Sequence, residues 1–407
     1  MDKILKKLDY YNLWNKAYLI ILGLYVLINV LDTTMFEINW PEKMGYVLYA
    51  IVGGYAIAKM ICFVYLKRYR AWELIFSFII IGTFTIPAVF TTSYSYLFGI
   101  AFLIVGAKDV DFDDILKVYM IVTAAVLICA VVASQTGLIV NLQYEDPNKG
   151  IRNSMGTIYP TDFGAHIFYL AAAWVCYRNK ALTWLEIGII SAVTIVVYVL
   201  SAPVTSAACT FLMLFMCAWD KLADKKHSSM IVSKAEDIVC RIGQFAVGIF
   251  AAGYLLMQHL YDPLNIYWSE FDYKISLRLY YTYQILEKYS IRLFGQDIEE
   301  KGFGRDPDMT HDYLFLDDSY MAIALKYGIV ILAVVIIMFA AGQYRAYRSN
   351  RLIIVLAGIV IALHCFMEHH LIEAAYNPFM LLVFAKIGAY TYKERKTNYE
   401  NRNLHQR

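Results

Sequence analysis

Charged residues are scarce in this chain of 407 residues, and repeats, low-complexity segments and paired-cysteine motifs are missing altogether. Asp, Glu, Lys and Arg make up 17% of the sequence, whereas a soluble globular protein usually carries about 25%. A soluble enzyme of this length would need more polar surface to cover its core. The apolar content of 60% excludes a disordered chain. The composition therefore predicts an all-α, polytopic membrane protein.

Further absences narrow the function. The net charge is only +2 and no basic stripe stands out, so we expect no nucleic acid as a partner. The 7 cysteines are scattered along apolar runs without a CxxC pair, which argues against a disulfide framework or a zinc site. No HExxH motif or dinucleotide fingerprint is present. We therefore expect neither a cofactor nor a bound metal ion.

Apolar runs that can cross a membrane recur along most of the chain. A transmembrane helix needs about 20 predominantly apolar residues, and the sequence predicts about ten to twelve such spans. The candidate spans are residues 17–36, 45–66, 72–90, 93–107, 115–135, 159–177, 182–200, 203–219, 238–260, 319–342, 352–370 and 376–392. No small-residue cleavage site follows the basic N-terminus, so the first helix is expected to be retained.

Lys and Arg are distributed unevenly between the segments that join these spans. Most of them fall on one side if the N-terminus (1–16) and the tail (393–407) are cytoplasmic, as the positive-inside rule requires. We therefore predict a multi-pass plasma-membrane protein with a membrane domain over 17–392. The two long connecting segments, 136–158 and 261–318, then lie outside. Cations retained there against the insertion bias are candidates for function.

The loop 136–158 contains Arg152 in a stretch rich in Gly, Asn and Ser. Pro160 suits the first turn of the following helix, because a proline there loses no helical hydrogen bond. Arg152 is therefore expected just before a helix N-terminus, where free N–H groups and a guanidinium bind anions. Tyr159 adjoins this helix start as a candidate substrate contact. An arginine that only reaches lipid headgroups is the alternative.

The loop 261–318 opens with an aromatic, amphipathic stretch. Lys274 and Arg278 are spaced one helical turn apart, with Tyr281 near them. Two cations at this spacing can straddle a diphosphate, although a helix face turned to headgroups would show the same pattern. Arg292 follows just before a turn.

Carboxylates and histidines lie near the predicted outer ends of two later spans. Asp317 and Asp318 immediately precede the span 319–342, where they can act as general bases or cap the helix. Glu368 and His369 lie at the end of the span 352–370, next to a second histidine. Adjacent histidines point to different sides of a helix, so we predict a polar cavity lining there and no metal site.

The order of these motifs resembles the O-antigen polymerase and ligase superfamily, the Wzy-type polymerases in particular. The matching stretches are RNSMGTIYPTDFGAHIFYL, LSAPVTSAACTFLMLF, LRLYYTYQILEKYSIRLFGQ, LDDSYMAIALKYGIVI and NPFMLLVFAKIGAY. The resemblance implies a GT-C-like membrane bundle whose extracytoplasmic loops form the active site. It also implies a reaction, the joining of oligosaccharide repeat units carried on undecaprenyl diphosphate into capsular polysaccharide, exopolysaccharide or O-antigen.

The family's essential outer-loop arginines correspond here to Arg152 and Arg278, with Arg292 as a weaker third. Candidates for activating the acceptor hydroxyl are four residues that the sequence does not rank: Asp317, Asp318, Glu368 and His369. The implied partners are lipid-linked oligosaccharides, membrane lipids, and the flippase and chain-length regulator of the same pathway.

Two other functions remain open at this point. A ligase would transfer the finished glycan to another acceptor, but ligases of the superfamily usually carry a histidine pair where this chain reads LDDSY at 316–320. A lipid-linked oligosaccharide flippase would not be an enzyme. Its cations would be expected within the spans, whereas here they are concentrated in an outer loop.

Overall fold

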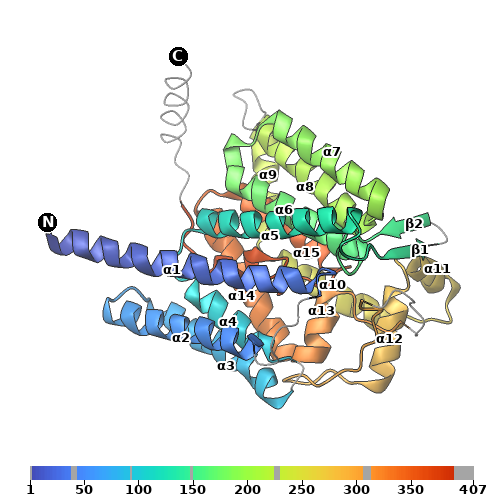
Figure 1. The fold of residues 1–407 in the computed structure, drawn as a ribbon, viewed down its shortest axis with the longest axis horizontal. Coiled ribbons are helices and arrows are strands. Elements are labelled where there is room, and N and C mark those ends of the chain that lie inside the picture. The colour runs from blue at the N-terminus through green and yellow to red at the C-terminus, as the bar shows by residue number, and fades with distance from the viewer. Residues whose placement is uncertain are drawn as a thin grey trace.

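Helices account for nearly all of the regular structure in the computed structural model (Figure 1). The structure describes residues 2–37, 44–91, 94–146, 150–223, 230–305 and 313–388, so the predicted tail 393–407 lies outside it. The α-helices are α1 (Asp2–Asp32), α2 (Met44–Tyr65), α3 (Ala71–Phe90), α4 (Tyr96–Gly106), α5 (Phe112–Gln135), α6 (Pro160–Arg178), α7 (Trp184–Ser201), α8 (Val204–Ala223), α9 (Met230–Gly243), α10 (Ala246–Leu260), α11 (Ile266–Lys274), α12 (Arg278–Lys288), α13 (Ser319–Ala322), α14 (Ile329–Arg348) and α15 (Leu352–His364). Shorter elements are the 3-10 helices η2 (Asn179–Ala181) and η4 (Pro378–Val383), the π-helical turn η3 (Ile323–Tyr327), and the antiparallel hairpin of β1 (Gln143–Asp146) and β2 (Gly150–Asn153).

Local sequence signals explain where several helices begin. Pro160 occupies the first turn of α6, as the sequence predicts. Asp111 caps α5 by accepting a hydrogen bond from the Asp113 amide at 3.0 Å. Thr183 and Glu186 form a reciprocal capping box at the start of α7.

Six helices among the described residues are long and apolar enough to cross a membrane, and a seventh is obtained if the bent pair α9–α10 counts as one span. The six are Asn12–Asp32, Met44–Tyr65, Ala71–Val89, Phe112–Gln135, Trp184–Ser201 and Ile329–Arg348. The chain is thus a helical, multi-pass membrane bundle, with fewer such helices than the ten to twelve predicted.

Part of this difference arises because apolar runs also form short buried helices. The predicted span 93–107 is the 11-residue α4, and 352–370 contains the 13-residue α15. Both helices are almost entirely buried by their neighbours, and runs of this length are typical of a protein core. Within the described residues, the predicted span 376–392 contains only the short η4. Hydropathy alone does not separate these cases.

The predicted span 319–342 is interrupted where the long loop packs against it. Its chain runs through α13 and η3, then breaks at Gly328 (φ 102°) before α14 begins. A Cβ at Gly328 would lie 2.3 Å from the Leu293 carbonyl oxygen, and one at Gly295 would lie 2.2 Å from the Lys326 carbonyl oxygen. Glycine is required at both positions because the two backbones approach so closely.

Both long connections lie at the same end of the bundle, which we call the loop face. It carries the β1–β2 hairpin, α11 and α12, at the right of Figure 1, whereas α1 begins at the left. The Gly304 amide of the second connection donates a hydrogen bond to the Tyr159 hydroxyl at 2.8 Å. The rings of Phe303 and Tyr144 also lie 6.4 Å apart. The candidate residues of the two loops are therefore brought together.

Candidate functional site

Arg278 begins a new helix at the loop face. The prediction that Lys274 and Arg278 share one helix face is wrong, because α11 ends at Lys274 and the chain turns before α12. Ser276 and Leu277 form the turn, with left-handed backbone angles (φ 66° and 59°). The Lys274 side chain is exposed.

A buried carboxylate holds this turn in place. Asp272 accepts hydrogen bonds from the Leu279 and Tyr280 amides at 2.9 and 3.0 Å, so it caps the N-terminus of α12. The Tyr261 hydroxyl donates to the same side chain at 3.0 Å. Asp272 thereby positions Arg278. This role was not predicted from the sequence, where the signal for it is an acidic residue shortly before a predicted cationic site.

The Arg278 guanidinium is buried, and among the described residues only one of its terminal nitrogens has a partner. Its Nη2 lies 3.1 Å from Oε1 of Glu368, and the two side chains are 12% and 5% exposed. Burial by itself lowers the pKa of Arg278, but Glu368 and then Asp317 raise it above its ordinary value. Nη1 is buried and has no partner among the described residues. A buried donor without a partner costs about 1–3 kcal/mol, so the free edge is suited to an acceptor that the fold does not supply.

Arg152 approaches the same carboxylate from the hairpin. It lies on β2 opposite Tyr144, and its Nε donates to the Ser201 carbonyl oxygen at 3.1 Å. The hairpin therefore directs the guanidinium to the C-terminus of α7, and not to the start of α6 as expected. Burial lowers the pKa of Arg152, whereas Asp146 and Glu368 raise it. The two predicted arginines thus interact electrostatically with one buried acid, Glu368.

Tyrosines surround this pair of arginines. The Tyr281 and Tyr313 rings lie 5.2 Å apart, and the Tyr313 hydroxyl donates to Oδ1 of Asp317 at 3.0 Å. Asp317 is half-buried and acts on Arg278 electrostatically. Tyr159 contacts the second long connection, because its hydroxyl accepts a hydrogen bond from the Gly304 amide. Polar aromatic side chains of this kind can contact both sugar rings and hydroxyl groups.

Asp318 caps a helix. Its Oδ1 accepts a hydrogen bond from the Met321 amide at 2.6 Å at the start of α13. The side chain is fully buried, and burial raises the pKa of Asp318 to about 7. Capping, which the sequence analysis kept as an alternative, accounts for this residue.

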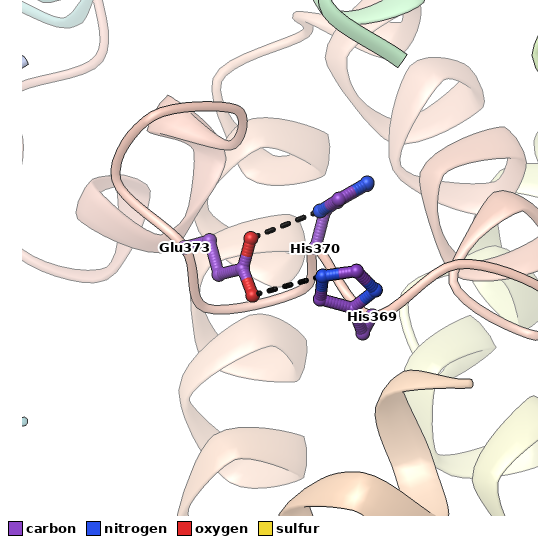
Figure 2. A group of neighbouring side chains, drawn as sticks. All are labelled: His369, His370 and Glu373. Carbon is purple, nitrogen blue, oxygen red and sulfur yellow. Dashed lines mark hydrogen bonds and ion pairs between the residues drawn. The ribbon is translucent and has the colours of Figure 1, made fainter. Parts of the chain in front are cut away.

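His369 and His370 lie in a non-helical segment, because α15 already ends at His364. The helical argument that separated the two rings therefore does not hold. Figure 2 shows both imidazoles facing the Glu373 carboxylate. His370 Nδ1 lies 2.9 Å from Oε2 of Glu373, and His369 Nε2 lies 3.6 Å from Oε1. The His369 ring also lies 5.2 Å from the ring of Phe315.

Arg292 lies in a different place. It lines a polar cavity of about 480 Å³ together with Lys288, Tyr289 and Gln296. The lining of this cavity includes neither Arg278 nor any residue that contacts its guanidinium. The predicted third arginine is therefore separate from the other two.

No protein-family model, curated protein or solved structure matches this chain. The chemistry of the loop face follows from its geometry. Arg278 and Arg152 can hold an anion next to membrane helices, and Asp317 and His369 can exchange a proton nearby.

Proposed function

We propose that the chain is a polymerase that joins oligosaccharide repeat units carried on undecaprenyl diphosphate at the outer face of the plasma membrane. The proposal rests chiefly on Arg278, whose Nη2 is held by Glu368 while its buried Nη1 has no partner among the described residues. A guanidinium presents several N–H groups in one plane and binds phosphate oxygens in pairs. A diphosphate is an acceptor of the required charge and shape.

The reaction needs the charge stabilisation that these arginines offer. An acceptor hydroxyl attacks the anomeric carbon of the donor glycan, and the bond from that carbon to the diphosphate oxygen breaks. The bonding electrons leave with the diphosphate, and the hydroxyl proton passes to a base. Negative charge therefore grows on the diphosphate, where the fixed Arg278 and Arg152 stabilise it.

Asp317 and His369 are the better placed of the candidate bases. Glu368 is already paired with Arg278, and Asp318 is fully buried as a helix cap. Asp317 is half-buried, and the His369 side chain is 25% exposed. Both are therefore more accessible to an acceptor than Glu368 and Asp318, although Asp317 accepts from Tyr313 and His369 lies beside Glu373.

The position of the site suits a substrate that is half lipid and half sugar. A polyprenyl chain can remain among the apolar helices while its diphosphate reaches Arg278 at their end. Assigning the loop face to the outer side follows from the distribution of Lys and Arg. On that side, a flippase would deliver the repeat units and a chain-length regulator would act on the product.

The proposal is tested in cells that assemble a polysaccharide with this protein. Deleting the gene should leave single lipid-linked repeat units on the outer surface. A flippase defect would leave them inside, and a ligase defect would leave long polymer on its lipid carrier. Either of the latter outcomes would refute the proposed polymerase.

A further inference from the structure

The segment between α15 and η4 contains a cluster of possible metal ligands, which includes His369, one of the two candidate bases. His369, His370 and Glu373 each offer one ligand atom, and these atoms all lie within 4.8 Å of one another. Figure 2 shows the carboxylate facing both imidazoles from one side, with one oxygen turned toward each ring.

The separations suit a small transition-metal ion. Zinc binds imidazole nitrogen at about 2.0–2.1 Å and carboxylate oxygen at about 2.0–2.2 Å, so neighbouring ligands of a tetrahedral ion lie about 3.4 Å apart. The N···O separations here are 2.9 Å for His370 and 3.6 Å for His369, on either side of that value. All three ligand atoms lie within 4.8 Å of one another, so one ion can be shared by the three residues after a small adjustment of the side chains.

The surrounding structure fixes the ligands in place. His370 stacks on Tyr376 with ring centroids 3.7 Å apart and an angle of 22° between the planes. The Ser319 hydroxyl donates to the Glu368 carbonyl oxygen at 2.6 Å and accepts from the Leu371 amide at 3.1 Å, which ties the turn to α13. Packing and backbone hydrogen bonds therefore orient the rings before any ion arrives.

The net charge of the cluster and its surroundings favours the binding of a cation. Two neutral imidazoles and one carboxylate carry a single negative charge. The nearby cations are neutralised by other acids. Lys326 Nζ lies 2.5 Å from Oε2 of Glu300, and Arg278 pairs with Glu368. A divalent ion at Glu373 would therefore not face an unpaired positive group.

The burial pattern leaves one side open. His370 is fully buried, whereas the side chains of His369 and Glu373 are 25% and 30% exposed. An ion can enter from the exposed side, and a fourth coordination position would remain there. Three protein ligands with one open position are typical of catalytic zinc sites. Mixed nitrogen and oxygen ligands disfavour Mg²⁺ and Ca²⁺, which prefer oxygen alone.

We propose that His369, His370 and Glu373 bind one divalent transition-metal ion, zinc in the first place, with an open coordination position toward the loop face. This inference goes beyond the proposed polymerase and does not depend on it. With His369 bound to the ion, Asp317 remains as the candidate base.

The test uses the full chain, purified in detergent with an affinity tag that contains no histidine. The protein is loaded with ZnSO₄, passed through gel filtration, and its retained zinc is measured by mass spectrometry. Wild type should retain one equivalent. Glu373→Gln and His369→Gln should lose affinity by more than the roughly 10–100-fold that even outer-shell changes cost.

The matched control is His259→Gln, which removes an exposed histidine at the end of α10 and should retain zinc as wild type does. Elution volume and thermal midpoint identify any variant that fails to fold. If one of the two ligand variants does not fold, the zinc retained by the other is compared with that of the wild type. A second readout is the visible absorption of bound Co²⁺, which is intense only in low-coordinate sites. Wild type that retains no zinc, or ligand variants that retain as much as wild type, would overturn the inference. The polymerase proposal would be unaffected, because metal retention does not report on polymer formation.

Discussion

The variant Arg278→Lys tests whether the Arg278 guanidinium binds a diphosphate or only supplies positive charge. In the wild type, Nη2 is held by Glu368 at 3.1 Å, and Nη1 has no partner within the part of the chain that the structure describes. A lysine ammonium is a single centre, so when it pairs with Glu368 it no longer offers a second donor in the same plane. Losing one preorganised donor to a developing charge typically costs about 10²–10³-fold in rate, or about 2.7–4 kcal/mol. We expect a loss of this size in the rate of polymer formation.

The assay is designed so that a folding defect is not mistaken for a chemical one. Lysine keeps a positive charge beside the buried Glu368, so the variant should insert and reach normal abundance. Polymer length on gels is compared with membrane abundance, and Arg305→Lys serves as the control. Arg305 lies in the same loop, but its Nη2 donates to the Asp32 carbonyl oxygen at 3.2 Å, and lysine there should be near normal. Full-length polymer from Arg278→Lys would refute the role assigned to its free edge.

Further predictions concern the supports of the site and the placement of the chain. Arg152→Lys should shorten the polymer at normal abundance, and wild-type gel profiles would contradict its assigned role. Asp272→Ala should destabilise the protein by about 0.5–2 kcal/mol through the lost cap, seen as a lower thermal midpoint together with slower polymerisation. Burial raises the pKa of Asp318 from 3.8 to about 7, so its ionisation weakens the fold increasingly as pH rises through that window. Asp318→Asn should remove this loss in thermal scans while keeping the cap, and an unchanged pH profile would count against it. A reporter active only in the cytoplasm should be silent when fused after Gly304 and active after Arg348; the reverse would invert the assigned orientation.

Part of the fold is predictable because membrane helices and their caps depend on local patterns. The all-α class, the start of α6 at Pro160 and the two long connections follow from composition, proline position and hydropathy. The apolar run of α15 also predicts a helix. Whether lipid or protein surrounds it depends on neighbours from other parts of the chain, so the number of spans was overestimated.

The candidate site was predictable only as far as residue types indicate chemistry. Arg152 and Arg278 stand out as cations in the loops on the predicted outer side, and the structure brings both to Glu368. The break between Lys274 and Arg278 was not predictable from helical spacing, because it depends on a cap that Asp272 makes across a turn. The same limit applies to His369 and His370. The orientation of the two imidazole rings depends on the residue at which α15 ends, and hydropathy does not predict that residue.

We propose that the loop face joins glycans carried on a lipid diphosphate. The most direct measurement incubates the purified protein in phospholipid vesicles with undecaprenyl-diphosphate-linked repeat units and resolves the products by length. We expect a ladder of polymers with release of undecaprenyl diphosphate from the wild type, and only single units with Arg278→Lys. Folded wild-type protein that leaves the substrate as single units, or an equal ladder from Arg278→Lys, would contradict it.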